Sequence, residues 1–263
     1  MVGINTICAP LFVPANRPDR FEKAAQSGAD AIILDLEDAI ATDSKNDARA
    51  ALRCDFTDLP VIIRINPAET PWHDADLAAV LTLPVAAVLL PKAEAGATLT
   101  ATAATLAGHA PVIALIETAR GIASARAVAT TPNIARLAFG SVDYCADLDC
   151  AHLREILLPA RCEMVLAARL AELPAPIDGV TTALDDMSVT ASDAEHARAL
   201  GMTGKLCIHP KQIDVVKRGF APTAAELDWA RRVLASGDGA VSVDGAMVDE
   251  PVRIKARTLL ARG

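Results

Sequence analysis

The sequence predicts a (β/α)8 barrel, the TIM-barrel class of α/β fold, with a C-terminal helix-hairpin extension. Short apolar runs rich in Val, Ile and Leu recur at intervals of about 25 to 35 residues, and helical stretches lie between them, which is typical of repeated βα units. Hydrophobic residues make up 52% of the chain and aromatic residues only 3%. This composition favours buried parallel strands covered by alanine-rich helices over an all-β sandwich.

Eight apolar runs are predicted to form the barrel strands. In chain order they are Cys8–Val13, Ala31–Leu34, Val61–Ile65, Ala87–Leu90, Val112–Ile116, Leu137–Phe139, Ile177–Asp178 and Lys205–Ile208. Helices are predicted over 17–27, 45–52, 93–106, 121–129, 153–173 and 192–200, and Gly201 fits the C-terminal cap of the last one. No glycine-rich fingerprint for a dinucleotide or a phosphate follows any strand, so we expect a closed barrel rather than a doubly wound open sheet.

The length of 263 residues suits a single barrel domain, which we predict over residues 1–220. Residues 221–263 form an extension that the barrel does not need. It contains a predicted helix over 224–234, a hairpin-like alternation in GAVSVDGAMV and a helical tail. We expect such an appendage to fold over the active site as a lid or to pack on a neighbouring subunit.

Charge and composition exclude several classes of function. The net charge of -8 and the absence of a Lys/Arg run disfavour nucleic acid as a partner. No segment has the length and apolarity of a membrane span, and the N-terminus lacks the features of a secretion signal. The six cysteines contain no C-x-x-C pair, which predicts reduced, mostly structural thiols. We therefore expect a soluble cytoplasmic enzyme.

Charged and polar residues follow six of the eight predicted strands. The active site of a (β/α)8 barrel lies at the C-terminal ends of its strands, where a buried charge must be paired, ligated or catalytic. The candidates, in chain order, are Glu37, Asp38, Arg64, Asn66, Lys92, Glu117, Asp143 and His209.

Glu117 and Asp143 are the predicted metal ligands. They follow adjacent strands and offer the carboxylate oxygens that Mg²⁺ prefers, with water and substrate completing its coordination. Zinc is disfavoured, because the five His and six Cys residues show no ligand spacing. The alternative is a purely structural Glu117 that is paired with Arg120 or Arg64.

Arg64 presents a planar fork that suits a carboxylate or a developing enolate oxygen better than Lys does. For Lys92 we favour charge stabilisation over Schiff-base chemistry, because neighbouring carboxylates keep it protonated. Glu37 and Asp38 are expected to orient Arg64 and Lys92 or to hold metal-bound water. Asn66 and His209 are further substrate-binding candidates, with a polar cap at the barrel rim as the alternative for His209.

Eight segments, in the same order, resemble the citrate lyase beta-subunit-like family, which includes malyl-CoA and citramalyl-CoA lyases and lies within the phosphoenolpyruvate/pyruvate barrel superfamily. The matching segments are LFVPANRPDRFEKA, ILDLEDAI, VIIRIN, LLPKAE, ALIETARGI, LAFGSVDY, ALGMTGKLCIHPKQI and GAMVDEP. The resemblance covers nearly the whole chain and implies the same barrel with Mg²⁺ bound by Glu117 and Asp143.

The resemblance also implies a function and an assembly. Arg64 would stabilise a thioester enolate, and Arg17, Arg20 and Lys23 would help to hold coenzyme A. The chain would form a trimer or hexamer, in which Asp249 of one subunit completes the site of another as a catalytic residue. The implied carbon–carbon lyase cleaves or forms a 3-hydroxy-3-carboxyacyl-CoA, such as citramalyl-CoA or malyl-CoA, with acetyl-CoA and a 2-oxoacid as the other partners.

Three other functions remain open at this point. One alternative is the lyase subunit of a citrate lyase complex that acts on a citryl thioester of an acyl carrier protein. A metal-dependent pyruvate aldolase on free hydroxy-oxo acids would need no coenzyme A. A barrel that only binds CoA esters is disfavoured, because the chain carries the whole set of charged candidates.

Overall fold

The computed structural model describes residues 3–237 and 239–262 and divides the chain into two compact units, Met1–Gly219 and Phe220–Gly263. The first unit is the predicted α/β barrel. Its eight parallel strands form one sheet in the order β1 to β8. The amides of Lys205 and Cys207 donate to the carbonyls of Cys8 and Pro10, at 2.8 and 2.9 Å, and so join the last strand to the first.

The eight predicted strands are all present, with small differences at their ends. They are β1 Pro10–Pro14, β2 Ala31–Asp35, β3 Val61–Arg64, β4 Ala87–Leu90, β5 Val112–Ile116, β6 Ile134–Phe139, β7 Ile177–Asp178 and β8 Gly204–Lys205. The regular part of β8 is shorter than predicted, although Cys207 still pairs with Leu11 through an isolated bridge.

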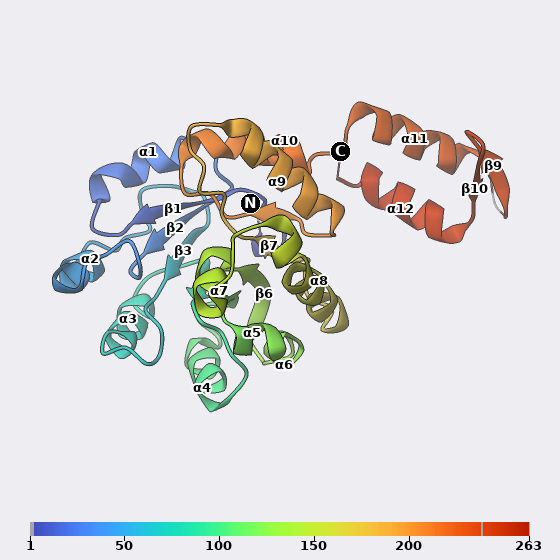
Figure 1. The fold of residues 1–263 in the computed structure, drawn as a ribbon. Helices are drawn as coiled ribbons and strands as arrows, with labels where there is room; N and C mark the ends of the chain where they lie inside the picture. Colours follow the sequence, from blue (N-terminus) through green and yellow to red (C-terminus); the bar gives the residue numbers. More distant parts are fainter. Residues whose placement is uncertain (1–2, 238, 263) are drawn as a thin grey trace. The chain divides into compact units, whose positions relative to one another are not determined.

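Helices surround the strands of this unit (Figure 1). They are α1 Phe21–Ala25, α2 Lys45–Ala50, α3 His73–Val80, α4 Ala97–Leu106, α5 Ala119–Ala123, α6 Ala125–Ala129, α7 Ser141–Leu148, α8 Arg154–Leu170, α9 Met187–Ala199 and α10 Ile213–Phe220. The predicted helix over 121–129 is broken at Ser124, and the one over 17–27 keeps only α1 after a 3-10 turn at Pro18–Arg20. Gly201 caps α9 with φ 99°, as expected.

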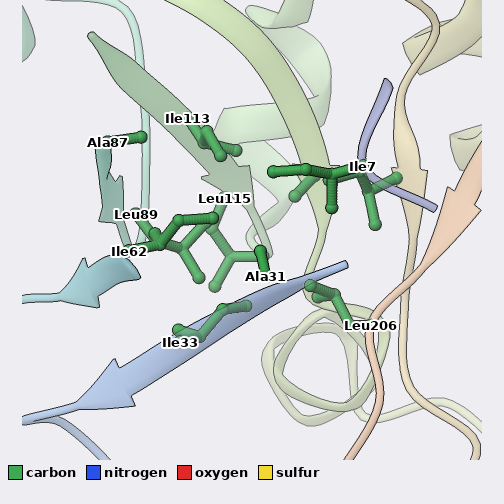
Figure 2. Packing of buried hydrophobic residues seen from close by; sticks show 11 residues of the cluster. Ile7, Ala31, Ile33, Ile62, Ala87, Leu89, Ile113, Leu115 and Leu206 are labelled. Carbon is green, nitrogen blue, oxygen red and sulfur yellow. The ribbon is translucent and has the colours of Figure 1, made fainter. Parts of the chain in front are cut away.

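Aliphatic side chains fill the interior of the barrel. Residues two apart on one strand point the same way, so Ala31 and Ile33 of β2 face Ile113 and Leu115 of β5 across the centre (Figure 2). Ile62 joins the same cluster from β3. Because the interior is packed with apolar groups, polar chemistry is confined to the two ends of the strands.

The N-terminal end of the barrel is closed by Arg136 of β6, which is fully buried. Its Nε donates to the carbonyl of Ala175 at 2.9 Å, and its Nη1 donates to the carbonyls of Ile4 and Ile7 at 2.9 and 2.8 Å. Its Nη2 donates to Thr203 Oγ1 at 2.9 Å. These acceptors precede β1, β7 and β8, so one guanidinium ties together the starts of several strands.

The second unit contains α11 Ala224–Ala235, the strands β9 Val241–Val243 and β10 Ala246–Val248, and α12 Glu250–Leu260. β9 and β10 pair antiparallel through a two-residue turn at Asp244 and Gly245, whose φ angles of 51° and 79° suit this type of hairpin. The two helices lie side by side (Figure 1) and share a small apolar core. Among the residues that the structure describes, no helix has the length and apolarity needed to span a membrane.

Candidate active site

A cavity of about 410 Å³ lies at the C-terminal end of the barrel strands. Its polar lining comes from Asp35, Asp38, Arg64, Glu117, Ser141 and Asp143. These residues follow or end β2, β3, β5 and β6, the positions at which a barrel of this kind carries its chemistry. Apolar side chains, among them Phe12 and Phe139, form much of the remaining wall.

Arg64 ends β3 opposite Asp35 of β2 and forms a bidentate pair with it. The Nε–Oδ1 and Nη2–Oδ2 distances are 2.6 and 2.7 Å. The third nitrogen, Nη1, lies 2.9 Å from Glu37 Oε2 and 3.1 Å from Asp38 Oδ2. The guanidinium also stacks over the Phe12 ring, 4.8 Å from its centroid. Arg64 is therefore fixed in one orientation at the edge of the cavity.

Lys92 follows β4 in a left-handed backbone conformation with φ 49°, which is rare for a residue other than glycine. Its amide donates to Glu117 Oε1 at 2.9 Å, and its ammonium lies 3.4 Å from Glu37 Oε1 and 3.9 Å from Glu117 Oε1. Such a conformation costs about 1–3 kcal/mol and persists where the surroundings enforce it, commonly at functional sites. Here it brings one amide and one cation to two buried carboxylates.

Glu117 is 1% exposed and directly follows β5. Its Oε2 has no hydrogen-bond partner among the residues that the structure describes. Burial raises the pKa of Glu117 to about 8, with Glu37 and Asp143 adding to the effect. Burial likewise raises the pKa of Glu37 to about 7, against the opposing pull of Arg64. Glu117 is paired with Lys92, and neither Arg120 nor Arg64 forms the ion pair of the structural alternative.

Asp143 lies in the first turn of α7 and lines the same cavity as Glu117. A carboxylate is favourable at this end of a helix, because the helix dipole is positive there. Gly140, just before α7, packs against Glu117 so closely that an added Cβ would lie 2.2 Å from Glu117 Oε2. The absence of a side chain at this position allows the two acidic groups to share one space.

The charges at this end of the barrel do not balance. Five carboxyl groups (Asp35, Glu37, Asp38, Glu117 and Asp143) face two cations (Arg64 and Lys92), so the acidic groups outnumber the basic ones, and the raised pKa values of Glu37 and Glu117 reflect this crowding as well as burial. In the part of the chain that the structure describes, no group of three His, Cys, Asp or Glu residues forms a complete metal cage. The oxygen donors, the excess charge and the unpartnered Glu117 Oε2 fit a hard divalent cation that keeps waters or substrate oxygens, as Mg²⁺ does.

Four predicted site residues, Glu37, Lys92, Asn66 and His209, do not line the 410 Å³ cavity. Glu37, Lys92 and Asn66 line a neighbouring cavity of about 640 Å³, to which Asp38 also contributes. Asn66 is 1% exposed and fully engaged, since it donates to Leu36 O and Asp76 Oδ2 and accepts from Lys45 Nζ. His209 caps the 3-10 turn Pro210–Gln212, and its Nδ1 accepts from the amide of Lys211 at 3.2 Å. The positions of Asn66 and His209 suit structural roles at the barrel rim.

Four residues were assigned a role by resemblance alone: Arg17, Arg20, Lys23 and Asp249. Arg17 is paired with Asp19 at 2.7 Å, while Arg20 and Lys23 are exposed on the first βα segment. None of the three lines the 410 Å³ cavity. Asp249 belongs to the second unit, where its Oδ1 accepts from the amide of Val252 at 3.3 Å and caps α12.

The sequence prediction missed the role of Asp35, which holds Arg64 more directly than Glu37 or Asp38. A signal was available, because Asp35 directly follows the predicted strand Ala31–Leu34 and Arg64 lies near the end of the predicted neighbouring strand Val61–Ile65. It also missed Ser141, whose hydroxyl lies 2.9 Å from His152 Nε2. Nothing in the local sequence indicates that pair, since Ser141 begins α7 and His152 lies in the loop beyond its end.

Residues 9–210 match the model of a protein family described as HpcH/HpaI aldolase/citrate lyase. The chain is 39% identical to a citrate lyase subunit beta-like protein of Deinococcus radiodurans, and the match covers 95% of each chain. It is 34% identical to a (3S)-malyl-CoA thioesterase of Cereibacter sphaeroides, over 96% of this chain and 93% of that one.

Solved structures show the same relationship. The protein CitE from Mycobacterium tuberculosis, in complex with magnesium, acetoacetate and coenzyme A, superposes with a TM-score of 0.88 at 37% identity. That match covers 98% of this chain and 99% of the other. Both the barrel and the C-terminal extension thus have counterparts in a carbon–carbon lyase family. The chain belongs to the HpcH/HpaI aldolase/citrate lyase family.

Proposed function

We propose that this protein is a Mg²⁺-dependent carbon–carbon lyase that acts on a 3-hydroxy-3-carboxyacyl-CoA. Malyl-CoA and citramalyl-CoA are the simplest such substrates, and the products are acetyl-CoA and a 2-oxoacid. The observation that carries the proposal is the acidic cavity, in which the unpartnered Glu117 Oε2 and Asp143 lie near a fixed Arg64. The magnesium and coenzyme A in the related CitE structure support it.

Glu117 and Asp143 are the residues that would hold the metal. When bound, Mg²⁺ supplies positive charge that draws substrate carboxylate and hydroxyl oxygens into place and stabilises negative charge during bond cleavage. Glu117 offers a carboxylate oxygen with no protein partner. Lys92 holds the other oxygen through its amide and so fixes the direction of the free one.

Arg64 stabilises the negative charge that develops on the thioester oxygen when the carbon–carbon bond breaks. Asp35 occupies two of its nitrogens, which fixes the plane of the guanidinium before substrate arrives. The third nitrogen lies next to Glu37 and Asp38 and is the one available for exchange with a substrate oxygen. Glu37 and Asp38 are therefore positioning residues in this proposal.

The outer parts of the site follow from the family resemblance. Arg17, Arg20 and Lys23 form a basic segment suited to the phosphates of coenzyme A. Asp249 of a neighbouring subunit exchanges a proton with the acetyl methyl group, in the homotrimer or hexamer that the resemblance implies.

A second candidate activity is hydrolysis of the malyl thioester to malate and free coenzyme A. The name of the Cereibacter sphaeroides relative, 34% identical over nearly the whole chain, favours it. The same binding groups serve both reactions, but the bond that breaks differs. Carbon–carbon cleavage yields a 2-oxoacid, and hydrolysis yields a free thiol.

The test is an assay of both products from malyl-CoA and from citramalyl-CoA, with Mg²⁺ and with EDTA. Metal-dependent release of glyoxylate or pyruvate, without free thiol, supports the lyase. Metal-dependent release of thiol alone supports the thioesterase. Cleavage of the free hydroxyacids would instead indicate a metal-dependent aldolase. Cleavage of a citryl thioester on a carrier protein, and of no CoA ester, would indicate a citrate lyase subunit.

A further inference from the structure

Another cavity, of about 400 Å³, lies beside the active site, between the N-terminus of α8, the helix α9 and the loop after β7. Its polar lining includes His152, Arg154, Arg161, Thr181 and Asp193. The proposed lyase chemistry uses none of these residues.

Arg161 is the feature of this cavity that lacks an explanation. It is 3% exposed, and its Nε and Nη2 donate to Asp178 at 2.8 and 3.3 Å. Its Nη1 has no hydrogen-bond partner in the described chain. A buried donor without a partner carries an appreciable free-energy cost, and the cost is larger for a charged group. A group that accepts from Nη1 would remove it.

The buried charge around Arg161 is positive. Asp178 is shared between Arg161 and Lys205, whose Nζ lies 2.9 Å from Asp178 Oδ2, and all three residues are buried. Two cations against one carboxylate leave one positive charge in excess. Burial lowers the pKa of His152, and Arg161 and Lys205 lower it further, which agrees with a positive potential on this side.

Two further groups favour an anion at the same place. The helix α8 has 17 residues and begins at Arg154 without a side-chain cap, so the positive end of its dipole faces the cavity wall. Arg154 donates to Asp193 Oδ1 from Nε and Nη2 at 2.9 and 2.7 Å. Asp193 Oδ2 accepts from Thr181 at 2.6 Å, so both of its oxygens are occupied. Glu155, also on the rim, is exposed to solvent.

We propose that this cavity is a binding site for an oxyanion, a phosphate or carboxylate group of a small molecule, held by Arg161, Arg154 and the N-terminus of α8. The site stands whether or not the neighbouring cavity acts on a thioester. Its wall is shared with the active site, since His152 contacts Ser141 of α7 and Thr181 follows Val180 of the active-site lining.

The test is calorimetric titration of the full chain with inorganic phosphate, at constant ionic strength set with chloride. We expect saturable binding, and R154Q should weaken it at least about tenfold, as for loss of a charge-assisted contact. R126Q removes the same charge from α6, where Arg126 is exposed and paired with Glu163, and should change the affinity less than twofold.

A second pair of variants leaves the arginines intact. Val189 lines the cavity from the exposed side of α9, so V189E adds a carboxylate at the rim and V189Q adds the same bulk without charge. We expect V189E to weaken phosphate binding at least about tenfold and V189Q less than twofold. Absence of saturable binding, or equal affinities within both variant pairs, would overturn the proposal.

A competition experiment identifies the source of the anion. Coenzyme A carries phosphates of its own, so its displacement of bound inorganic phosphate is measured in the wild type and in V189E, whose cavity should hold little phosphate. If coenzyme A displaces phosphate from the wild type, and V189E no longer binds that phosphate, the cavity holds a phosphate of the substrate. Phosphate that stays bound beside coenzyme A marks it as a site for a separate metabolite.

Discussion

Two buried arginines at opposite ends of the barrel show how the same side chain takes different roles. Arg136, at the N-terminal end, donates to backbone carbonyls and one hydroxyl, and burial lowers its pKa to about 10. Arg64, at the C-terminal end, faces carboxylates; burial lowers its pKa, but Asp35 and Glu37 outweigh burial and raise it above its ordinary value. The first set of contacts is complete without a ligand. The second lies in an excess of negative charge that calls for a cation.

The largest effect is expected at the acidic end, from E117Q. This change removes the charge of the carboxylate whose Oε2 is unpartnered, while keeping its shape. We expect Mg²⁺-dependent turnover to fall at least about 10³-fold, because the metal contributes several kcal/mol of charge stabilisation. Steady-state kinetics with varied Mg²⁺ measures this.

The matched control for E117Q is E163Q, which makes the same chemical change at a surface carboxylate paired with Arg126. Its turnover should equal that of the wild type. If E117Q keeps wild-type activity and an unchanged unfolding midpoint, Glu117 is not a metal ligand, and its burial has a structural role only.

R136M is expected to produce the largest loss of stability. The substitution leaves the carbonyls of Ala175, Ile4 and Ile7 buried without donors, for a loss of about 3–5 kcal/mol in the free energy of unfolding. Urea unfolding measures this free energy. R136K should recover only part of the lost stability, since an ammonium cannot reach all the acceptors. If turnover per folded molecule falls in R136M as far as in E117Q, the contrast between the two ends fails.

The sequence predicted the parts of the fold that follow from local periodicity. Aliphatic runs fixed the eight strands, while α3, α7 and α10 were missed. α7 is only eight residues long and carries Asp143, Asp147 and Cys145, residues with modest helix propensity, so its helical form depends on tertiary packing. The start of α9 was placed five residues late, although Asp186 accepts from the amide of Ser188 and gives a recognisable N-terminal cap.

The candidate site was predictable where one residue follows one strand. Glu117, Asp143 and Arg64 were chosen in this way, and the structure brings all three to the wall of one cavity. What the rule cannot supply is a residue's partners. Asn66 lies two residues beyond Arg64, the last residue of β3, yet Lys45 and Asp76 occupy its side-chain amide, and both lie on helices that a strand-end rule ignores.

R64K tests whether the acidic end needs the fork of a guanidinium or only its charge. An ammonium cannot keep both contacts with Asp35 and still reach toward the cavity. We expect kcat to fall about 10²-fold, comparable to loss of one donor to a developing oxyanion. The comparison with R136K is the informative one, because R136K should lower stability and leave kcat unchanged. Equal kcat values in the two variants would contradict the division of roles.

G140A tests the close packing that lets Glu117 share the cavity with Asp143. The new Cβ would lie 2.2 Å from Glu117 Oε2 and 2.4 Å from Glu117 Cβ, so the carboxylate must move. A displacement of about 1 Å at a catalytic group costs up to about 10²-fold, and we expect kcat to fall about 10- to 100-fold. G96A, at a glycine with open space around it, should leave kcat unchanged. Unchanged kcat in G140A would show that the position of Glu117 is not critical.

The smallest effect is expected from R20Q, on the exposed segment proposed to hold coenzyme A phosphates. Arg20 lies in solvent, where an ion pair contributes about 0.2–1 kcal/mol and is screened by salt. We expect KM for the CoA ester to rise about two- to fivefold at low salt, less at 0.5 M salt, and kcat to stay the same. R126Q, with the same charge loss elsewhere, should not change KM. A fall in kcat in R20Q would mean that this exposed cation acts on bond cleavage, and the contrast between buried chemistry and exposed binding would no longer hold.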